Sequence, residues 1–300
     1  MYQAIRCVKL NGREVLLEVT LDESSVIVDD MDEIMHLNNI ENFKEGDTIM
    51  KIKMRNADFE CTWSDNQIKT ANASSHIEVT VAIFRHILNL FKFSEKIELD
   101  LFLNSKEVKN FPVLEGVTAT SLRGVPLDAT TVEAFCEKYP TQKSFALASK
   151  LSGELNPKSP IFKVEDIYFL EYESRISTFP DNFTGRIGII ENAQFPTASI
   201  IQFMRKWMIG SAHQNLELFR VTFAPGHFID RRIVVRAFNN EAKVSKRSEN
   251  YEYNTQVIRS YKPNIFHYAR FFEIERHSDG KKASFSVNMN WFEFRVWNIN

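Results

Sequence analysis

A helix-then-strand pattern recurs through the middle of the chain and constrains the fold more than any other sequence feature. It first appears at 75–101, where apolar residues at helical spacing precede an alternating strand pattern. It returns at 130–148 and again at 199–221. Because successive strand cores lie roughly 20 to 30 residues apart, the pattern predicts irregular leucine-rich-like repeats that stack into one continuous surface. A mixed sheet packed against helices would give the same pattern.

The clearest predicted helix covers 199–209. One face of this helix collects large apolar residues, namely Ile200, Phe203, Met204, Trp207 and Met208. Spacings of three and four place these side chains on a buried stripe, so they are expected in the core and not at a binding surface. Gly210 is expected to end the helix. The earlier helix at 130–139 has Thr130 and Glu133 at the spacing of a capping box.

The two ends of the chain are predicted to be β-structure. Near the start, two extended segments flank Asn11-Gly12, a dipeptide that suits a hairpin turn. Near the end, the strand patterns at 271–276 and 283–287 flank a Ser-Asp-Gly turn, and 291–297 adds a third strand. The predicted class is therefore α+β or α/β. The expected organisation is an N-terminal antiparallel β region at 1–75, leucine-rich-like repeats at 76–224 and a C-terminal β-hairpin region at 225–300.

Composition limits the classes of partner. With 44% apolar residues, including 25 Phe, a chain of 300 residues can bury its own core. The formal net charge of −2 gives no general attraction to nucleic acid or to an anionic membrane, so neither is expected as a partner. Three cysteines and the absence of a leader or spanning pattern favour a reducing, cytoplasmic location, with the nucleus as an alternative.

The sequence contains no pattern that carries chemistry. The seven histidines lack a spacing that would place two metal ligands on one helical face. There is no nucleophile elbow and no glycine-rich phosphate loop. We therefore expect a non-enzymatic protein with no cofactor and no metal. An enzyme whose site assembles from distant residues is kept as an alternative.

Several segments resemble the type-2 F-box-associated domain that is expanded in nematodes. The helix with Phe203, Trp207 and its stop at Gly210, followed by the Leu-Glu-Leu-Phe strand at 216–219, is similar to the helix and strand of that domain. Residues 162–191 look like its upstream portion, with two short strands around Ser-Thr-Phe-Pro-Asp-Asn-Phe. The ending at 274–297 is also similar. The resemblance is strongest over 160–224 and extends over about 76–297.

The resemblance implies a substrate-recognition adaptor of a cullin-type ubiquitin ligase, which reaches the ligase through an N-terminal F-box and a Skp-type linker. An F-box opens on a Leu-Pro pair, whereas here the first proline is Pro112 and no Leu-Pro pair occurs. The expected partner is thus a protein substrate or ligand, with Skp and cullin subunits as further candidates. The alternative is a free interaction protein or decoy with no ligase role.

Strand alternation predicts which residues face a partner. In the strand at 97–101, the leucines are expected inside and Glu98 and Asp100 outside. The same argument places Tyr168, Arg186 and Glu217 outside. These five are the predicted protein-binding residues. Tyr168 and Arg186 are expected to be hot spots whose replacement weakens binding without unfolding the protein. A register slip of one residue would invert each assignment.

Overall fold

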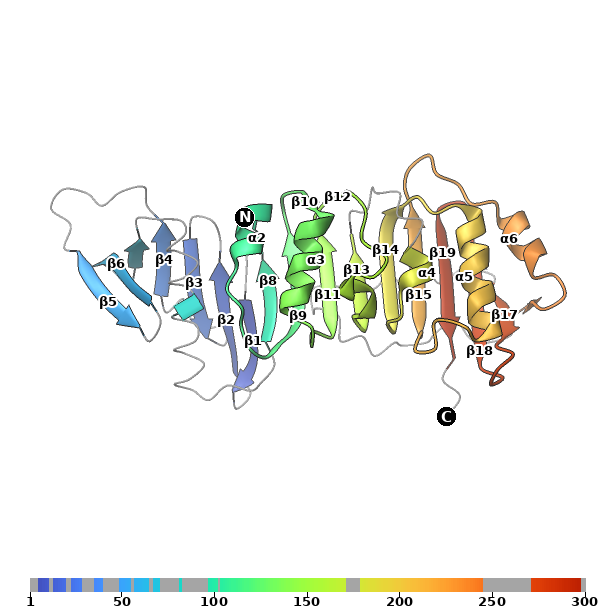
Figure 1. Cartoon of the computed structure of the whole chain (residues 1–300), viewed down its shortest axis with the longest axis horizontal. Helices are drawn as coiled ribbons and strands as arrows, with labels where there is room; N and C mark the ends of the chain where they lie inside the picture. Colours follow the sequence, from blue (N-terminus) through green and yellow to red (C-terminus); the bar gives the residue numbers. More distant parts are fainter. Residues whose placement is uncertain are drawn as a thin grey trace. The chain divides into compact units, whose positions relative to one another are not determined.

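The computed structural model of the chain consists of two compact units, unit 1 (Met1–Val125) and unit 2 (Pro126–Asn300) (Figure 1). The structure describes the ranges 5–10, 13–19, 23–28, 35–39, 49–54, 57–64, 67–70, 81–82, 97–101, 103–170, 179–244 and 271–297. The unit boundary falls inside the predicted central region at 76–224. The predicted domain boundaries themselves stay predictions. Helices and strands are mixed in the chain, as an α+β class requires.

Unit 1 contains a mixed β-sheet. Its strands are β1 (Ile5–Leu10), β2 (Arg13–Val19), β3 (Glu23–Val28), β4 (Met35–Asn39), β5 (Met50–Met54), β6 (Ala57–Ser64), β7 (Gln67–Thr70), β8 (Ile97–Leu101) and β9 (Val117–Arg123). Their pairing gives the order β5-β6-β7-β4-β3-β2-β1-β8-β9. The hairpin predicted around Asn11-Gly12 is confirmed by the antiparallel β1–β2 pair.

The prediction of a wholly antiparallel N-terminal region is wrong at one pair, because β4 and β7 run parallel. Parallel neighbours need a long crossover connection, and here β5 and β6 lie in the sequence between β4 and β7. Of the helix predicted from Ser75, only Val81 and Ala82 are described, and both are helical. The remainder of that predicted helix lies outside the described residues.

A short helix that the sequence patterns did not predict, α2 (Ser105–Asn110), separates β8 from β9. Its first free amides are satisfied by a capping box. The Asn104 side chain accepts from the backbone amides of Lys106 and Glu107, and the Glu107 carboxylate accepts from the Asn104 amide. Because α2 is too short to show an apolar period, its capping box is the feature that determines where it begins.

The strands of unit 2 likewise pair in a mixed arrangement. Its strands, in spatial order, are β11 (Ser144–Ala148), β13 (Asp166–Phe169), β14 (Ile187–Ala193), β15 (Leu218–Phe223), β19 (Trp291–Val296), β18 (Lys282–Val287), β17 (Phe272–Glu275) and β16 (Lys243–Val244). The first four are parallel, and every later pair is antiparallel. The predicted C-terminal hairpin region is confirmed. Two short parallel strands, β10 (Leu127–Asp128) and β12 (Leu151–Ser152), pair separately.

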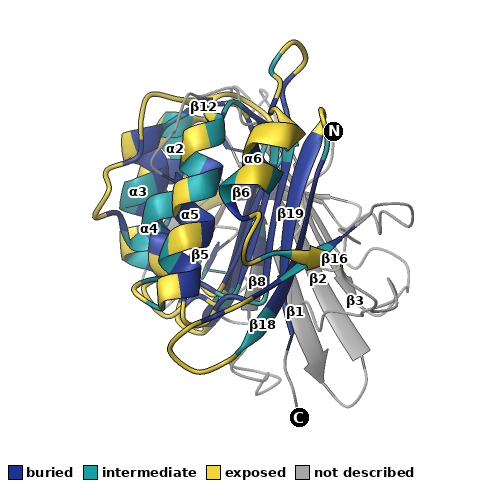
Figure 2. Ribbon diagram, turned by 90° about the vertical axis from the view of Figure 1, so that its right-hand side faces the viewer, coloured by how far each residue is buried: buried dark blue, intermediate teal, exposed yellow. Residues whose placement is uncertain are grey.

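Helical segments cover one face of the unit 2 sheet (Figure 2). They are α3 (Ala129–Lys138), the 3-10 helix η1 (Pro160–Lys163), α4 (Phe179–Asn182), α5 (Thr197–Ile209) and α6 (Arg231–Ala237). As predicted, α5 ends at Gly210, whose φ of 81° lies in the left-handed region that glycine tolerates. The capping box predicted for α3 is wrong. Asp128 is the N-cap and accepts from the Thr131 amide at 2.8 Å, so Thr130 lies inside the helix.

The core between these helices and the sheet is aromatic. The ring of Phe203 on α5 lies 4.8 Å from that of Phe219 and 5.3 Å from that of Phe294, measured between centroids. Trp207 stands edge-on to Phe294 at 5.1 Å. The predicted stripe of α5 is fully buried. These contacts join α5 to both β15 and β19. They therefore help to hold the carboxyl-terminal strands against the parallel strands.

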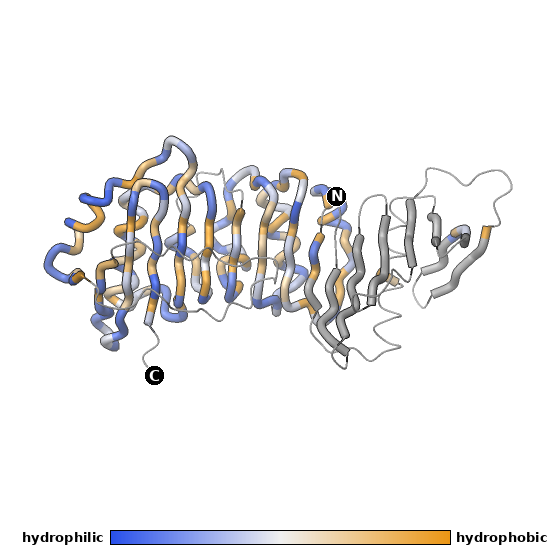
Figure 3. Tube along the Cα trace, turned by 180° about the vertical axis from the view of Figure 1, so that it is seen from behind, coloured by the Kyte–Doolittle hydropathy of each residue, from blue (hydrophilic) through white to orange (hydrophobic). Residues whose placement is uncertain are grey.

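The opposite face of the unit 2 sheet is also buried. Hydrophobic and hydrophilic residues alternate along these strands (Figure 3), yet β13 has no exposed position. Residues of four adjacent strands form an apolar cluster on this face: Ala146, Tyr168, Ile187, Ile189 and Leu218. Strand alternation therefore gives the face that a residue lies on, but not its exposure.

Candidate protein-interaction site

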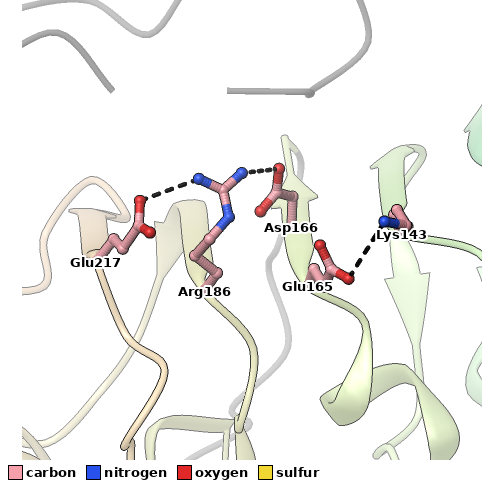
Figure 4. Close-up of polar contacts among 5 residues, drawn as sticks. All are labelled: Lys143, Glu165, Asp166, Arg186 and Glu217. Atoms are coloured by element: carbon pink, nitrogen blue, oxygen red, sulfur yellow. Dashed lines mark hydrogen bonds and ion pairs between the residues drawn. The ribbon is translucent and has the colours of Figure 1, made fainter. Parts of the chain in front are cut away.

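A row of charged residues marks the amino ends of the parallel strands of unit 2. Four charged residues each lie directly before the first paired residue of a parallel strand: Lys143, Glu165, Arg186 and Glu217. A fifth, Asp166, is the first residue of β13. Since these strand starts are aligned, the four preceding side chains follow one another across the sheet with alternating charge (Figure 4). We call these five residues the charged row.

Backbone hydrogen bonds fix the spacing of the row. The Asp166 amide donates to the Lys143 carbonyl at 2.9 Å, and the Arg186 amide donates to the Glu165 carbonyl at 2.6 Å. The Glu217 amide donates to the Arg186 carbonyl at 2.8 Å. The side chains are thus carried by a paired backbone and not by a free loop, which lowers the entropy lost when a partner binds.

One half of the row is a largely buried ion-pair network. Arg186 bridges two carboxylates: its Nη2 lies 2.7 Å from Asp166 Oδ2, and its Nη1 lies 3.0 Å from Glu217 Oε2. The Asp166 side chain is 2% exposed. A guanidinium that joins residues from three strands fixes their relative positions, so this half of the row is structural.

The other half of the row is open to solvent. The side chains of Lys143 and Glu165 are 53% and 54% exposed, and their charged atoms lie 3.9 Å apart. At that distance and exposure, the pair adds little to stability. These two side chains are free to exchange their mutual contact for contacts with a partner.

Burial controls the protonation of Asp166. Desolvation raises its pKa from 3.8 to about 6, although the adjacent Arg186 acts in the opposite direction. Its Oδ1 is buried with no hydrogen-bond partner among the described residues, in keeping with that penalty. Burial lowers the pKa of Arg186, but Asp166 and Glu217 together outweigh it, and that pKa lies above its ordinary value.

Tyr168 does not have the exposure that the sequence predicted. It lies on the face opposite Ile167, as alternation required, but only 1% of its surface is accessible. Its hydroxyl donates to Glu191 Oε1 at 3.0 Å. The expectation failed because this face of the sheet is itself buried. Tyr168 is therefore a core residue, and its replacement would act first on stability.

The other predicted residues divide between the units. Arg186 and Glu217 come together in the charged row, each about three-quarters buried. In unit 1, Leu99 and Leu101 are buried as predicted, and Asp100 lies 2.8 Å from Arg123 Nε. Glu98 pairs in register with Arg6 of β1, but its side chain lies outside the described residues.

Three members of the row, Lys143, Glu165 and Asp166, were not among the predicted residues. Their signal was present in the sequence, because a charged residue directly precedes each apolar strand core of this region. The row itself could be recognised only from the register between the strands. Arg186, for example, pairs with residues that lie 20 and 31 positions away in the sequence.

Two reactive side chains of unit 2, His213 and Cys136, are buried in structural surroundings. Burial lowers the pKa of His213, whose Nδ1 lies 2.9 Å from the Phe183 carbonyl oxygen. Burial also raises the pKa of the Cys136 thiol far above its ordinary value, so the thiolate nucleophile is disfavoured. Within the described residues, no group of three or more His, Cys, Asp or Glu could hold a metal ion.

Comparisons with known proteins add no assignment. No protein-family model matches the chain. Neither a curated protein nor a solved structure gives a significant match. The resemblance to type-2 F-box-associated domains therefore stays a prediction. None of the helices in the described ranges has the length and apolar character needed to cross a bilayer.

Proposed function

We propose that this chain is a non-enzymatic protein-interaction module, with a role related to substrate recognition by F-box ubiquitin-ligase adaptors. The observation that carries the proposal is the charged row, in which four strand starts present alternating charges on a hydrogen-bonded backbone. Complementary charges on a partner would fix its register along such a row. The exposed Lys143 and Glu165 are the residues best placed to make the first contacts.

The arrangement of unit 2 supports the leucine-rich-like interpretation within this proposal. The parallel strands begin at residues 144, 166, 187 and 218, and helical segments return the chain along one face. Solenoid proteins use stacked strands of this kind as extended binding surfaces. In this interpretation the charged row is the edge of such a surface, and Arg186 holds its strands in register.

Affinity purification of the full chain, followed by mass spectrometry, tests the proposal. Lys143→Glu and Glu165→Lys each reverse one exposed charge of the row, and each is expected to remove a partner that the unchanged chain retains. Lys158→Glu is the matched control, since Lys158 is exposed elsewhere in unit 2. If every partner survives both reversals, the charged row is not the interface.

The same experiment separates a ligase adaptor from a free interaction protein. An adaptor is expected to bring down Skp and cullin subunits together with its substrate. A free module or decoy is expected to bring down the substrate alone. Ligase subunits that bind equally well to both row variants would place their contact on another surface.

A further inference from the structure

The surface of α6 and the loop before it combines exposed apolar and basic side chains. Phe228 is 61% exposed and Ile233 is 51% exposed, although both belong to residue types that are usually buried. Arg232 and Arg236 of α6 are exposed as well. We call Phe228, Arg232, Ile233 and Arg236 the α6 surface.

The helical period explains why Arg232, Ile233 and Arg236 share the outward side of α6. Val234 and Phe238, four residues apart, are the buried side chains of this segment, and Phe238 packs on Phe285 with ring centroids 6.0 Å apart. At 100° per residue, Arg232 and Arg236 lie on the side opposite Val234. Ile233 lies on the flank of the same outward side. Figure 2 shows exposed residues along the outward side of α6.

The positive charge of this surface is available to a partner. Arg232 and Arg236 have no ion-pair or side-chain hydrogen-bond partner among the described residues. Arg231 is set apart from them, because its guanidinium lies over the Phe272 ring at 5.9 Å. The nearest carboxylate in sequence is Asp230, which accepts from the Arg232 amide as the helix cap. A chain with a formal net charge of −2 thus concentrates basic groups here.

We propose that the α6 surface binds an acidic peptide segment of another protein through carboxylates and an apolar side chain. Arg232 and Arg236 are one helical turn apart, so two carboxylates at a similar spacing can accept from both guanidinium groups. Phe228 and Ile233 then cover an apolar side chain between or beside those carboxylates. Arginine and aromatic residues are the types that most often carry interface energy. This surface is separate from the charged row and does not depend on the function proposed for it.

An anionic membrane is the competing occupant, and the geometry favours the peptide. Helices that lie on membranes present a continuous apolar face to the lipid. The apolar face of α6 is already used inside the protein, through Val234 and Phe238. The two exposed apolar side chains and the two arginines of the α6 surface suit a short segment with matching carboxylates better than a bilayer.

Selection from a phage-displayed library of random peptides on the immobilised full chain tests the proposal. Enriched peptides are expected to combine Asp or Glu with Leu, Phe or Trp. With a synthesised, labelled copy of an enriched peptide, Arg232→Glu plus Arg236→Glu is expected to lower affinity by about tenfold or more, and Phe228→Ala by about fivefold. Lys158→Glu plus Lys163→Glu makes the same change in net charge at exposed positions of unit 2 and is expected to leave affinity unchanged.

Three results would overturn the proposal. One is no enrichment, or enrichment of peptides without acidic residues. Another is a selected peptide that binds the Arg232→Glu plus Arg236→Glu variant as well as the unchanged chain. The third is binding to phosphatidylserine-containing vesicles that requires these arginines, with no acidic peptide selected. Circular dichroism of each variant checks the fold, and Lys143→Glu, which tests the charged row, is expected to leave peptide binding intact.

Discussion

The two faces of the unit 2 sheet are both buried, but different forces hold them at β15 and β19. On the helix-covered face, aromatic rings from α5, β15 and β19 pack against one another, and contact area supplies the stability. On the opposite face, Arg220 and Arg295 both contact the fully buried Glu293. Burial alone therefore does not reveal what a position tolerates. The aromatic core should be sensitive to lost volume, and the group of Arg220, Glu293 and Arg295 on the opposite face to lost charge pairing.

The largest effect is expected on the aromatic face. Phe203→Ala should lower the free energy of unfolding by about 4 kcal/mol, since a fully buried ring is removed and its neighbours cannot close the cavity. Urea denaturation followed by circular dichroism measures the loss. Phe228→Ala removes the same side chain from an exposed position and should change stability by less than about 0.5 kcal/mol. A small loss at Phe203 would show that the aromatic core is loosely packed.

At Glu293 on the opposite face, charge and not volume should dominate. Glu293→Gln keeps the size of the side chain but removes the carboxylate that joins two buried guanidinium groups. We expect a loss of about 3 kcal/mol. Glu275→Gln is the control, because Glu275 is exposed on β17, and it should be neutral. Equal stability of the Glu293→Gln variant and the unchanged chain would mean that the two faces do not differ in the way proposed.

Asp166 adds a dependence on pH that the aromatic face cannot have. Its pKa is raised from 3.8 to about 6 in the folded chain, chiefly by burial. The folded state therefore binds a proton more tightly than the unfolded state between these values. The resulting stabilisation is complete below about pH 4 and is lost as the pH rises through about 6.

Asp166→Asn isolates this contribution, because the amide does not titrate. The difference in unfolding free energy between the unchanged chain and the variant should fall by about 2–3 kcal/mol from pH 4 to pH 7. Denaturant titrations at a series of pH values measure it. A difference that rises with pH would show that the ion pair with Arg186 outweighs desolvation, and that the folded-state pKa lies below its ordinary value.

The elements of unit 2 were largely predictable because their signals are local. The apolar stripe and the glycine stop of α5 predicted its position and its end, and the Ser-Asp-Gly turn predicted the β17–β18 hairpin. The cap of α3 was harder, because Asp128, Thr130 and Thr131 are all plausible capping residues. Only the hydrogen bonds to the Asp128 carboxylate decide among them.

The candidate site was less predictable because it depends on register and coverage. Arg186 and Glu217 were named from the sequence, but their shared network with Asp166 joins residues far apart in the chain. Strand alternation did not predict that the second face, opposite the helices, is buried. The apolar run Ile-Tyr-Phe-Leu at 167–170 nevertheless indicated it. Strands buried on both faces appear as nearly continuous apolar runs, whereas half-buried strands alternate.

The smallest expected effect tests directly whether the second face, which contains Tyr168, is part of the core. Tyr168→Phe removes only the hydroxyl that donates to Glu191 at 3.0 Å, so it should lower the free energy of unfolding by about 1 kcal/mol. Tyr168→Ala also removes the buried ring and should cost about 3 kcal/mol or more. Denaturation curves compare the two, and partner capture is expected to follow the fraction folded. If Tyr168→Ala instead abolishes capture while stability is unchanged, Tyr168 is a contact residue, and the second face is a binding surface and not part of the core.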